Sequence, residues 1–343
     1  KLEDNPQQEW ITVCPHEVKE KLGIVLPNMY NEDFVEAYGK IEKAVEDGIL
    51  KVFTKYKVID LWRKYLQVFF EKGRPYAGFM CKVNRDNPNK HDGFIYCLNL
   101  CVESFSNTKP DVYHHTCSLA SLVVGRIAVN ELSNKASSLT RLLNNGMMIT
   151  KAPVVESENH LRDYRTIGVG IQGLADILAR EWKSYEDLDF ITEVCERIQY
   201  GCVRESIQMA KEYSPYPKFK GSRWDVGDIF DEYHKNSVCP DLDWLEQKQL
   251  CKQYGIYNSQ LTSPAPNTST SLFMMASAGF MPHYAEYFYE DNKDGKTPVS
   301  SMYGKDNPIF YANSVGYFKQ HELTKAVGAR QKFVDTGISA EYG

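Results

Sequence analysis

The segment YCLNLCVESF, residues 96–105, places an amide, a thiol and a carboxylate at alternate positions: Asn99, Cys101 and Glu103. Alternate side chains of an extended segment point to the same side, so these three can converge on one small volume. A carboxylate there can act as general base toward a substrate hydroxyl, which an amide can orient by hydrogen bonding. Because a neighbouring negative charge raises the pKa of a thiol, the pattern predicts a cysteine that reacts without ionising.

The same region contains a spacing that could bind zinc. Cys97, Cys101, His114 and Cys117 include a C-x3-C-x12-H arrangement, which falls in the range of small zinc sites. A second C-x-x-C pair is lacking, and a chain of 343 residues can form a large core without a structural metal. The third interpretation is that these are buried, inert thiols. Of these interpretations, we do not favour the metal site.

The composition disfavours several functional classes. A net charge of -5 and a pI near 6.0 argue against a nucleic-acid-binding surface spread over the chain. No apolar run reaches about eighteen residues and no signal-peptide pattern is present, so we expect no membrane partner and a cytoplasmic location. The nine cysteines are therefore expected to be thiols.

Hydrophobic periodicity predicts the elements that position these residues. Helices are expected around residues 32–45, 58–70, 118–143, 171–180, 190–213 and 317–338, with the second one core-packed and ended by Gly73. Residues 75–110 are expected to be extended segments and turns, and residues 255–261 to be strand-like. This mixture indicates an α/β fold, and we expect residues 1–343 to form one continuous unit.

Two further segments contain residues that could contact a ligand. The run GVGIQG, residues 168–173, fits the dinucleotide-binding pattern G-x-G-x-x-G, but polar residues precede it, so close packing at a helix start is the preferred interpretation. The loop PNTSTS precedes an apolar run that is expected to be helical from Leu272. It offers backbone N–H groups and the hydroxyls of Thr268, Ser269 and Thr270 to a phosphate group at this helix start. The alternative for this loop is a set of helix-capping residues.

Several motifs together resemble one known family. NLCVE resembles the NLCxE finger-loop motif of the ribonucleotide reductase large, or catalytic, subunit. Further segments resemble other motifs of that family, in the same order along the chain: WITVCPHEV, GRPYAGFMCKVNRDNPN, TCSLASL, RTIGVGIQGLADIL and YGIYNSQLTSPAPNTSTS. The resemblance implies a portion of a ten-stranded α/β barrel with a central finger loop and surrounding helices.

The resemblance also implies roles for individual residues. Cys101 would become a thiyl radical that removes the 3′ hydrogen of a ribonucleotide, and Glu103 would be the base at the 3′-hydroxyl, where Asn99 also binds. Cys117 would be the later cysteine of the reducing pair, with its partner on residues absent from this chain, and Cys97 a packing residue. The phosphate loop would comprise Asn267, Thr268, Ser269, Thr270 and Ser271.

The family's large subunit also has an N-terminal allosteric region, a first half-barrel and a C-terminal tail. Their motifs are not found here, so we expect one fragment of a split ribonucleoside-diphosphate reductase, active only with complementary polypeptides. The resemblance implies no directly bound cofactor, a radical from a metal-containing small subunit rather than adenosylcobalamin, and thioredoxin or glutaredoxin as reductant. The alternatives are an inactive assembly subunit and a dinucleotide-binding oxidoreductase.

Overall fold

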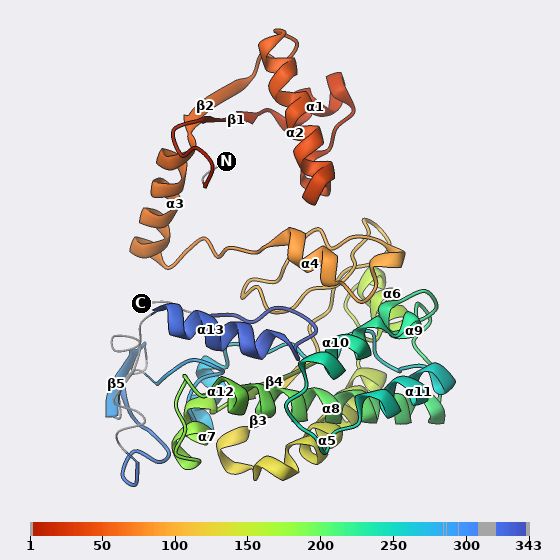
Figure 1. The fold of residues 1–343 in the computed structure, drawn as a ribbon, viewed down its shortest axis with the longest axis vertical. Helices are drawn as coiled ribbons and strands as arrows, with labels where there is room; N and C mark the ends of the chain where they lie inside the picture. Colours follow the sequence, from red (N-terminus) through yellow and green to blue (C-terminus); the bar gives the residue numbers. More distant parts are fainter. Residues whose placement is uncertain (1–2, 284, 286, 294, 308–319, 341–343) are drawn as a thin grey trace. The chain divides into compact units, whose positions relative to one another are not determined.

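A computed structural model describes residues 3–283, 285, 287–293, 295–307 and 320–340 (Figure 1). Contacts divide the chain into two compact units, a smaller one of residues 1–85 and a larger one of residues 86–343. The mixed α/β content predicted from the sequence is confirmed. Among the described helices, none is long and apolar enough to cross a membrane.

The smaller unit combines one antiparallel strand pair with helices. Its elements are β1 (Glu9–Val13), α1 (Pro15–Leu22), α2 (Asn31–Glu46), β2 (Phe53–Lys57), α3 (Val58–Lys72) and α4 (Met80–Asp86), which ends at the unit boundary. β1 pairs with β2, and a small core forms from Ile11, Val18, Ile41, Ala44, Val45 and Leu50. The helix predicted at residues 32–45 is confirmed as α2.

Helix α3 matches its predicted bounds but not its predicted burial. It ends where expected, because Gly73 has a φ of 62° and donates its N–H to the Phe69 carbonyl at 2.7 Å. None of its residues is buried, and Trp62 is 43% and Phe70 87% exposed. The core of this unit is formed by β1, α1, α2 and Leu50, so the prediction that α3 is core-packed is wrong.

The larger unit contains the other described strands and α-helices. They are β3 (Leu119–Val123), α5 (Leu132–Ile149), α6 (Val155–Tyr164), β4 (Gly168–Gln172), α7 (Leu174–Arg180), α8 (Leu188–Glu212), α9 (Arg223–Val226), α10 (Asp228–Asn236), α11 (Trp244–Tyr254), α12 (Thr268–Phe273), β5 (Tyr287–Asn292), β6 (Gly295–Ser300) and α13 (Gln320–Gln331). The expected helix over residues 190–213 is confirmed as α8, and the expected helix over residues 317–338 begins outside the described residues.

Strands β3 and β4 form a parallel pair at the centre of this unit. They pair over their full lengths, and Val169 of β4 makes a parallel bridge to Thr262 on its other side. The helix predicted over residues 118–143 is therefore wrong in its first part, because pairing with β4 satisfies the backbone of residues 119–123. The described strands form three separate two-stranded sheets and no closed barrel, so the ten-stranded barrel portion stays a prediction.

The glycine run 168–173 serves close packing. Gly168 and Gly170 lie within the wholly buried strand β4, where a Cβ atom at Gly168 would collide with Leu119. A Cβ atom at Gly170 would come within 2.8 Å of the Ser121 hydroxyl oxygen. Only Gly173, with a φ of 88°, lies at the helix start. The glycines of a dinucleotide-binding loop follow the strand instead, so this alternative loses its support.

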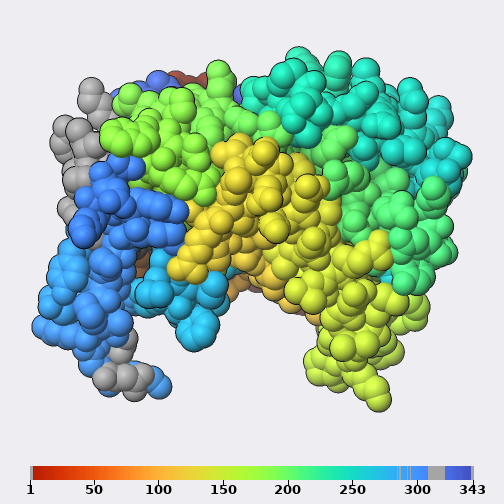
Figure 2. Space-filling model, turned by 90° about the horizontal axis from the view of Figure 1, so that it is seen from below, coloured from red at the N-terminus to blue at the C-terminus, as the bar shows by residue number. Residues whose placement is uncertain are grey.

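The main core of the larger unit is organised around the buried helix α8. Helix α5 packs along it, and Figure 2 shows α5 in yellow at the surface beside green residues of the same unit. The two helices approach closely at Gly201, where a Cβ atom would overlap the backbone of Ser133. The hydroxyl of Ser137 also donates to the Gly201 carbonyl at 2.8 Å.

We predict that Gly201→Ala destabilises the chain, because a methyl group there forces α5 and α8 apart. The expected loss in the free energy of unfolding is about 1–3 kcal/mol or more. The matched control is Gly146→Ala in α5, where a Cβ atom meets nothing within 4 Å. That change should be neutral or stabilise by roughly 0.5–1 kcal/mol. Urea unfolding followed by circular dichroism measures both; equal effects would contradict the close approach.

Candidate active site

Residues 99–104 form a tight turn. The Asn99 N–H donates to the Ser104 carbonyl at 3.1 Å, and the Ser104 N–H donates to Asn99 Oδ1 at 2.9 Å. Val102 has a φ of 67°, in the left-handed region, and its N–H donates to the Asn99 carbonyl. The extended geometry predicted for Asn99, Cys101 and Glu103 is therefore wrong, because the chain reverses between them. We call residues 99–106 the finger loop.

Glu103 is the buried anchor of the finger loop. Its carbonyl accepts hydrogen bonds from Ser263 Oγ at 3.0 Å and from the Gly337 N–H at 3.1 Å. Its side chain is 2% exposed, and Oε2 has no hydrogen-bond partner among the described residues. A buried carboxylate oxygen of this kind is available to accept a proton from a bound hydroxyl group.

Cys101 is a half-buried thiol close to this carboxylate. Burial raises the pKa of Cys101, and the negative charge of Glu103 and the neighbouring Cys117 raise it further. The thiol is therefore protonated at neutral pH. This agrees with the sequence-based expectation of a cysteine that reacts without ionising.

Cys117 lies on the segment that leads into β3 and contacts the finger loop. Its Sγ is 3.4 Å from Ser104 Oγ and 3.6 Å from His115 Nε2. The thiol is exposed, whereas Cys101 is half-buried. Because Cys117 contributes to the raised pKa of Cys101, the structure brings these two predicted cysteines together.

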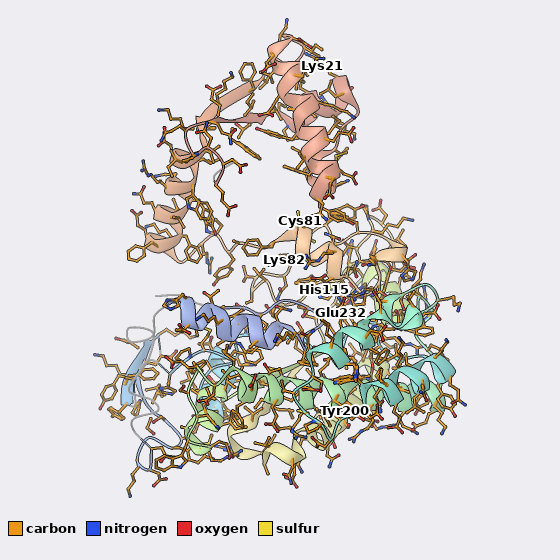
Figure 3. All side chains as sticks on the ribbon, viewed as in Figure 1. Lys21, Cys81, Lys82, His115, Tyr200 and Glu232 are labelled. Atoms are coloured by element: carbon orange, nitrogen blue, oxygen red, sulfur yellow. The ribbon has the colours of Figure 1, made fainter. Side chains whose placement is uncertain are left out.

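No metal site is formed by the described residues, among which no group of three or more His, Cys, Asp or Glu side chains could hold a metal ion. The zinc spacing at Cys97, Cys101, His114 and Cys117 therefore gains no support. Cys97 is exposed rather than buried. The upstream cysteines Cys14 and Cys81 belong to the smaller unit, where Cys81 is labelled in Figure 3.

A chain of hydrogen-bonded polar side chains contacts the finger loop, and no sequence motif predicted it. His115, labelled in Figure 3, lies 2.8 Å from Ser104 Oγ through Nε2 and 2.7 Å from Ser106 Oγ through Nδ1. Ser106 Oγ lies 2.6 Å from Nε2 of His160, which is fully buried in α6. Burial lowers the pKa of His115 to about 4 and that of His160 to about 3. The only available signal was the alternation of Ser104 and Ser106 next to the HHTC segment.

In the predicted phosphate loop, the first and last residues form hydrogen bonds within the protein, and the three residues between them are exposed. Asn267, with a φ of 59°, donates from Nδ2 to the Ile171 carbonyl of β4 at 2.9 Å and accepts from Ser121 Oγ of β3 at 3.1 Å. Ser271 is buried and donates to the Thr268 carbonyl. The three residues at the start of α12 are exposed: Thr268, Ser269 and Thr270. The helix begins at Thr268 instead of the predicted Leu272, since the Ser271 N–H already donates to the Asn267 carbonyl.

A family model described as the ribonucleotide reductase barrel domain matches residues 2–342 of the chain. This chain belongs to the ribonucleotide reductase barrel-domain family. The chain is 34% identical, over 98% of its length, to the ribonucleoside-diphosphate reductase subunit alpha of Synechocystis sp., and 30% identical, over 98%, to that of Treponema pallidum. The ribonucleoside-diphosphate reductase large subunit of Danio rerio is 30% identical over 85% of the chain.

The chain spans less than half the length of these ribonucleotide reductase relatives, namely 44%, 42% and 36%. The family resemblance expected from NLCVE and the motifs in order with it is confirmed. The roles of the individual site residues stay predictions.

We predict that Glu103→Gln speeds alkylation of Cys101 by iodoacetamide at neutral pH. Removing the carboxylate charge lowers the pKa of Cys101, so more thiolate is present; the expected increase is roughly two- to tenfold. Mass spectrometry of the labelled peptides measures the rate, and exposed Cys97 is the internal control. An unchanged rate at Cys101 would show that Glu103 exerts no charge effect on this thiol.

Proposed function

We propose that this chain carries the catalytic residues of a ribonucleotide reductase large subunit and reduces ribonucleotides to 2′-deoxyribonucleotides by a thiyl-radical mechanism. The observation that carries the proposal is the protonated thiol of Cys101 beside the buried carboxylate of Glu103 and within electrostatic reach of Cys117. A thiol that loses a hydrogen atom becomes a thiyl radical without a change of charge, and this environment favours the thiol.

The first half of the reaction uses the finger loop. Cys101, once oxidised to a thiyl radical, removes the 3′ hydrogen atom of the ribose and becomes a thiol again. Glu103 takes the proton of the 3′-hydroxyl, for which its unpartnered Oε2 is suited, and Asn99 binds the same hydroxyl through its amide nitrogen. Asn99 Oδ1 is already engaged by the Ser104 N–H, which fixes the side chain.

The second half of the reaction uses Cys117 and a partner cysteine. The 2′-hydroxyl leaves as water after taking one thiol proton. Oxidation of the two thiols to a disulfide supplies two electrons, which with the second thiol proton form the new C–H bond at the 2′ carbon, and Glu103 returns its proton to the 3′ oxygen. Cys101 then returns its hydrogen atom to the 3′ carbon and is again a radical. We propose that the partner cysteine belongs to a complementary polypeptide and that thioredoxin or glutaredoxin reduces the disulfide.

The proposed mechanism requires a source for the radical at Cys101. We propose a metal-containing small subunit as its source, with adenosylcobalamin as the less favoured alternative. Electron paramagnetic resonance on the reconstituted complex distinguishes the two: a radical that forms only with the small subunit supports the first. A radical that forms with adenosylcobalamin alone would support the second.

The proposed substrate is a ribonucleotide whose phosphates bind at the start of α12. The names of the relatives as ribonucleoside-diphosphate reductases favour a diphosphate. The exposed residues Thr268, Ser269 and Thr270 offer hydroxyl and backbone N–H groups, and Asn267 and Ser271 hold the loop in place.

We predict that Cys101→Ser abolishes turnover in a complex reconstituted from this chain, the complementary large-subunit polypeptides and the small subunit. A serine hydroxyl cannot form a thiyl radical, whereas Cys97→Ser, the matched control, should retain turnover. We also expect this chain with the small subunit alone to be inactive. Deoxyribonucleotide formation measures activity, and size-exclusion chromatography measures assembly.

Two outcomes would contradict this assignment. If Cys101→Ser keeps its turnover, the radical does not reside on this thiol. If the wild-type complex assembles fully but forms no product with any radical source, the chain is an inactive assembly subunit. Robust turnover with only the small subunit would contradict the split-subunit proposal.

We predict that Ser269→Asp raises the KM for the nucleoside diphosphate by about tenfold or more, because a carboxylate at this position repels a phosphate group. A negative charge in the first turn of a helix does not weaken the helix, so α12 should remain intact. Ser269→Asn, which is similar in size and neutral, is the control. Steady-state kinetics of the reconstituted complex measures KM; equal values for both variants would place the phosphates elsewhere.

A further inference from the structure

Asp176, in the first turn of α7, is a fully buried carboxylate that binds the segment after α12. Its Oδ2 accepts hydrogen bonds from the Ser277 N–H at 2.7 Å and from Ser277 Oγ at 3.0 Å. In return, the Ser277 carbonyl accepts from the Gly173 N–H at 2.8 Å. Hydrogen bonds to a carboxylate are among the stronger ones in proteins, so these contacts hold Ser277 against α7.

Two glycines leave room for this carboxylate. A Cβ atom at Gly173, the last glycine of the GVGIQG run, would lie 3.0 Å from Asp176 Oδ2. A Cβ atom at Gly125 would collide with the Cβ atom of Asp176. Gly173 also has a φ of 88°, a conformation that residues with a Cβ atom rarely adopt. The last glycine of the run therefore makes space for the carboxylate that binds Ser277.

The residues on either side of Ser277 contact the phosphate loop and the chain that leads into it. Ala276 donates its N–H to the Ser271 carbonyl at 2.9 Å. Gly279 packs against the backbone before α12, because a Cβ atom there would lie 3.1 Å from the Pro266 carbonyl oxygen. The segment that Asp176 binds is therefore in contact with both ends of the phosphate loop.

The start of α12 has a separate anchor at Asn267, which donates to the Ile171 carbonyl of β4. The helix is thus held before its first residue by Asn267 and after its last residue by Ser277. The exposed residues that could bind a phosphate group lie between these two anchors. A loop that is already fixed in its binding form loses less conformational entropy when the ligand binds.

We propose that Asp176 is a positioning residue that, through Ser277, holds the phosphate loop in the form that binds the phosphate groups of the substrate. The inference rests on the proposed function, in which these groups bind at the start of α12. The finger loop is held by other contacts, to Ser263 and Gly337. Loss of the Asp176 carboxylate should therefore weaken substrate binding more than the chemical step.

The first test measures KM for the nucleoside diphosphate and kcat in the reconstituted complex. Asp176→Leu keeps the size of the side chain but removes both oxygens, so KM should rise roughly three- to tenfold with little change in kcat. Asp176→Asn retains an oxygen that can accept from Ser277, and its KM should stay within about twofold of the wild type. The control is Ser137→Ala, which loses a buried hydrogen bond between α5 and α8 and should leave KM unchanged.

An equal KM for the Leu and Asn variants would overturn the proposal, since the hydrogen-bond acceptor would then have no effect on binding. If Asp176→Leu fails to fold, Ser277→Ala tests the same link, because it removes the hydroxyl hydrogen bond and keeps the N–H one. Its KM should rise about two- to fivefold. An unchanged KM in that variant would overturn the proposal as well.

Hydrogen–deuterium exchange of the full chain tests the anchor without turnover. Asp176→Leu should speed the exchange of backbone amides in residues 268–276 roughly tenfold, because the loop opens more often. Asp176→Asn and Ser137→Ala should leave exchange in this segment unchanged. Wild-type exchange rates in Asp176→Leu would show that the carboxylate does not hold the loop, which overturns the proposal.

The charged variant Ser269→Asp separates this inference from the proposed function. If Ser269→Asp raises KM and Asp176→Leu does not, only the role of Asp176 fails. If neither variant changes KM, the phosphates bind elsewhere, and the proposed phosphate site fails together with the inference. Turnover retained by Cys101→Ser would contradict the radical mechanism and leave the comparison of KM values valid.

Discussion

The burial of the Glu103 carboxylate beside a thiol is the interaction on which the candidate site depends. Removing a carboxylate from water is costly, and Oε2 has no compensating partner among the described residues. Other contacts must therefore hold the finger loop in place, and the structure supplies them through the Glu103 backbone and the Asn99 side chain. Low solvation then keeps both Cys101 and the histidines behind the loop uncharged. An uncharged thiol and uncharged histidines suit the proposed hydrogen transfer better than ionic chemistry.

Sequence patterns predicted the features that depend on local physics. Helix α3 ends at Gly73 because only a residue free of Cβ strain adopts that left-handed conformation readily. Helix α8 was predicted because its apolar period persists over several turns. The raised pKa of Cys101 was anticipated because Glu103 lies only two residues away. Family membership was predicted because several motifs occur in one order, which is more specific than any single motif.

Features that depend on distant residues could not be predicted in this way. The sequence pattern predicts helix at β3 because its partner β4 is far along the chain, and pairing overrides local propensity. The turn in the finger loop is local, but it depends on the left-handed Val102, an uncommon conformation for a β-branched residue that no sequence pattern indicates. The links from His115 to Ser106 and from Ser106 to His160 have no periodic pattern. They are visible only once the finger loop and α6 are placed together.

The two hydrogen bonds to the Glu103 carbonyl have a consequence for the order of folding during synthesis. Ser263 is 160 residues downstream of Glu103, and Gly337 follows later still. Contacts of such long sequence separation form late, because the intervening chain must first be made and its loop closed. Cys101 and Cys117 therefore leave the ribosome well before their final surroundings exist, and during that interval their thiols lack the cover that these contacts provide.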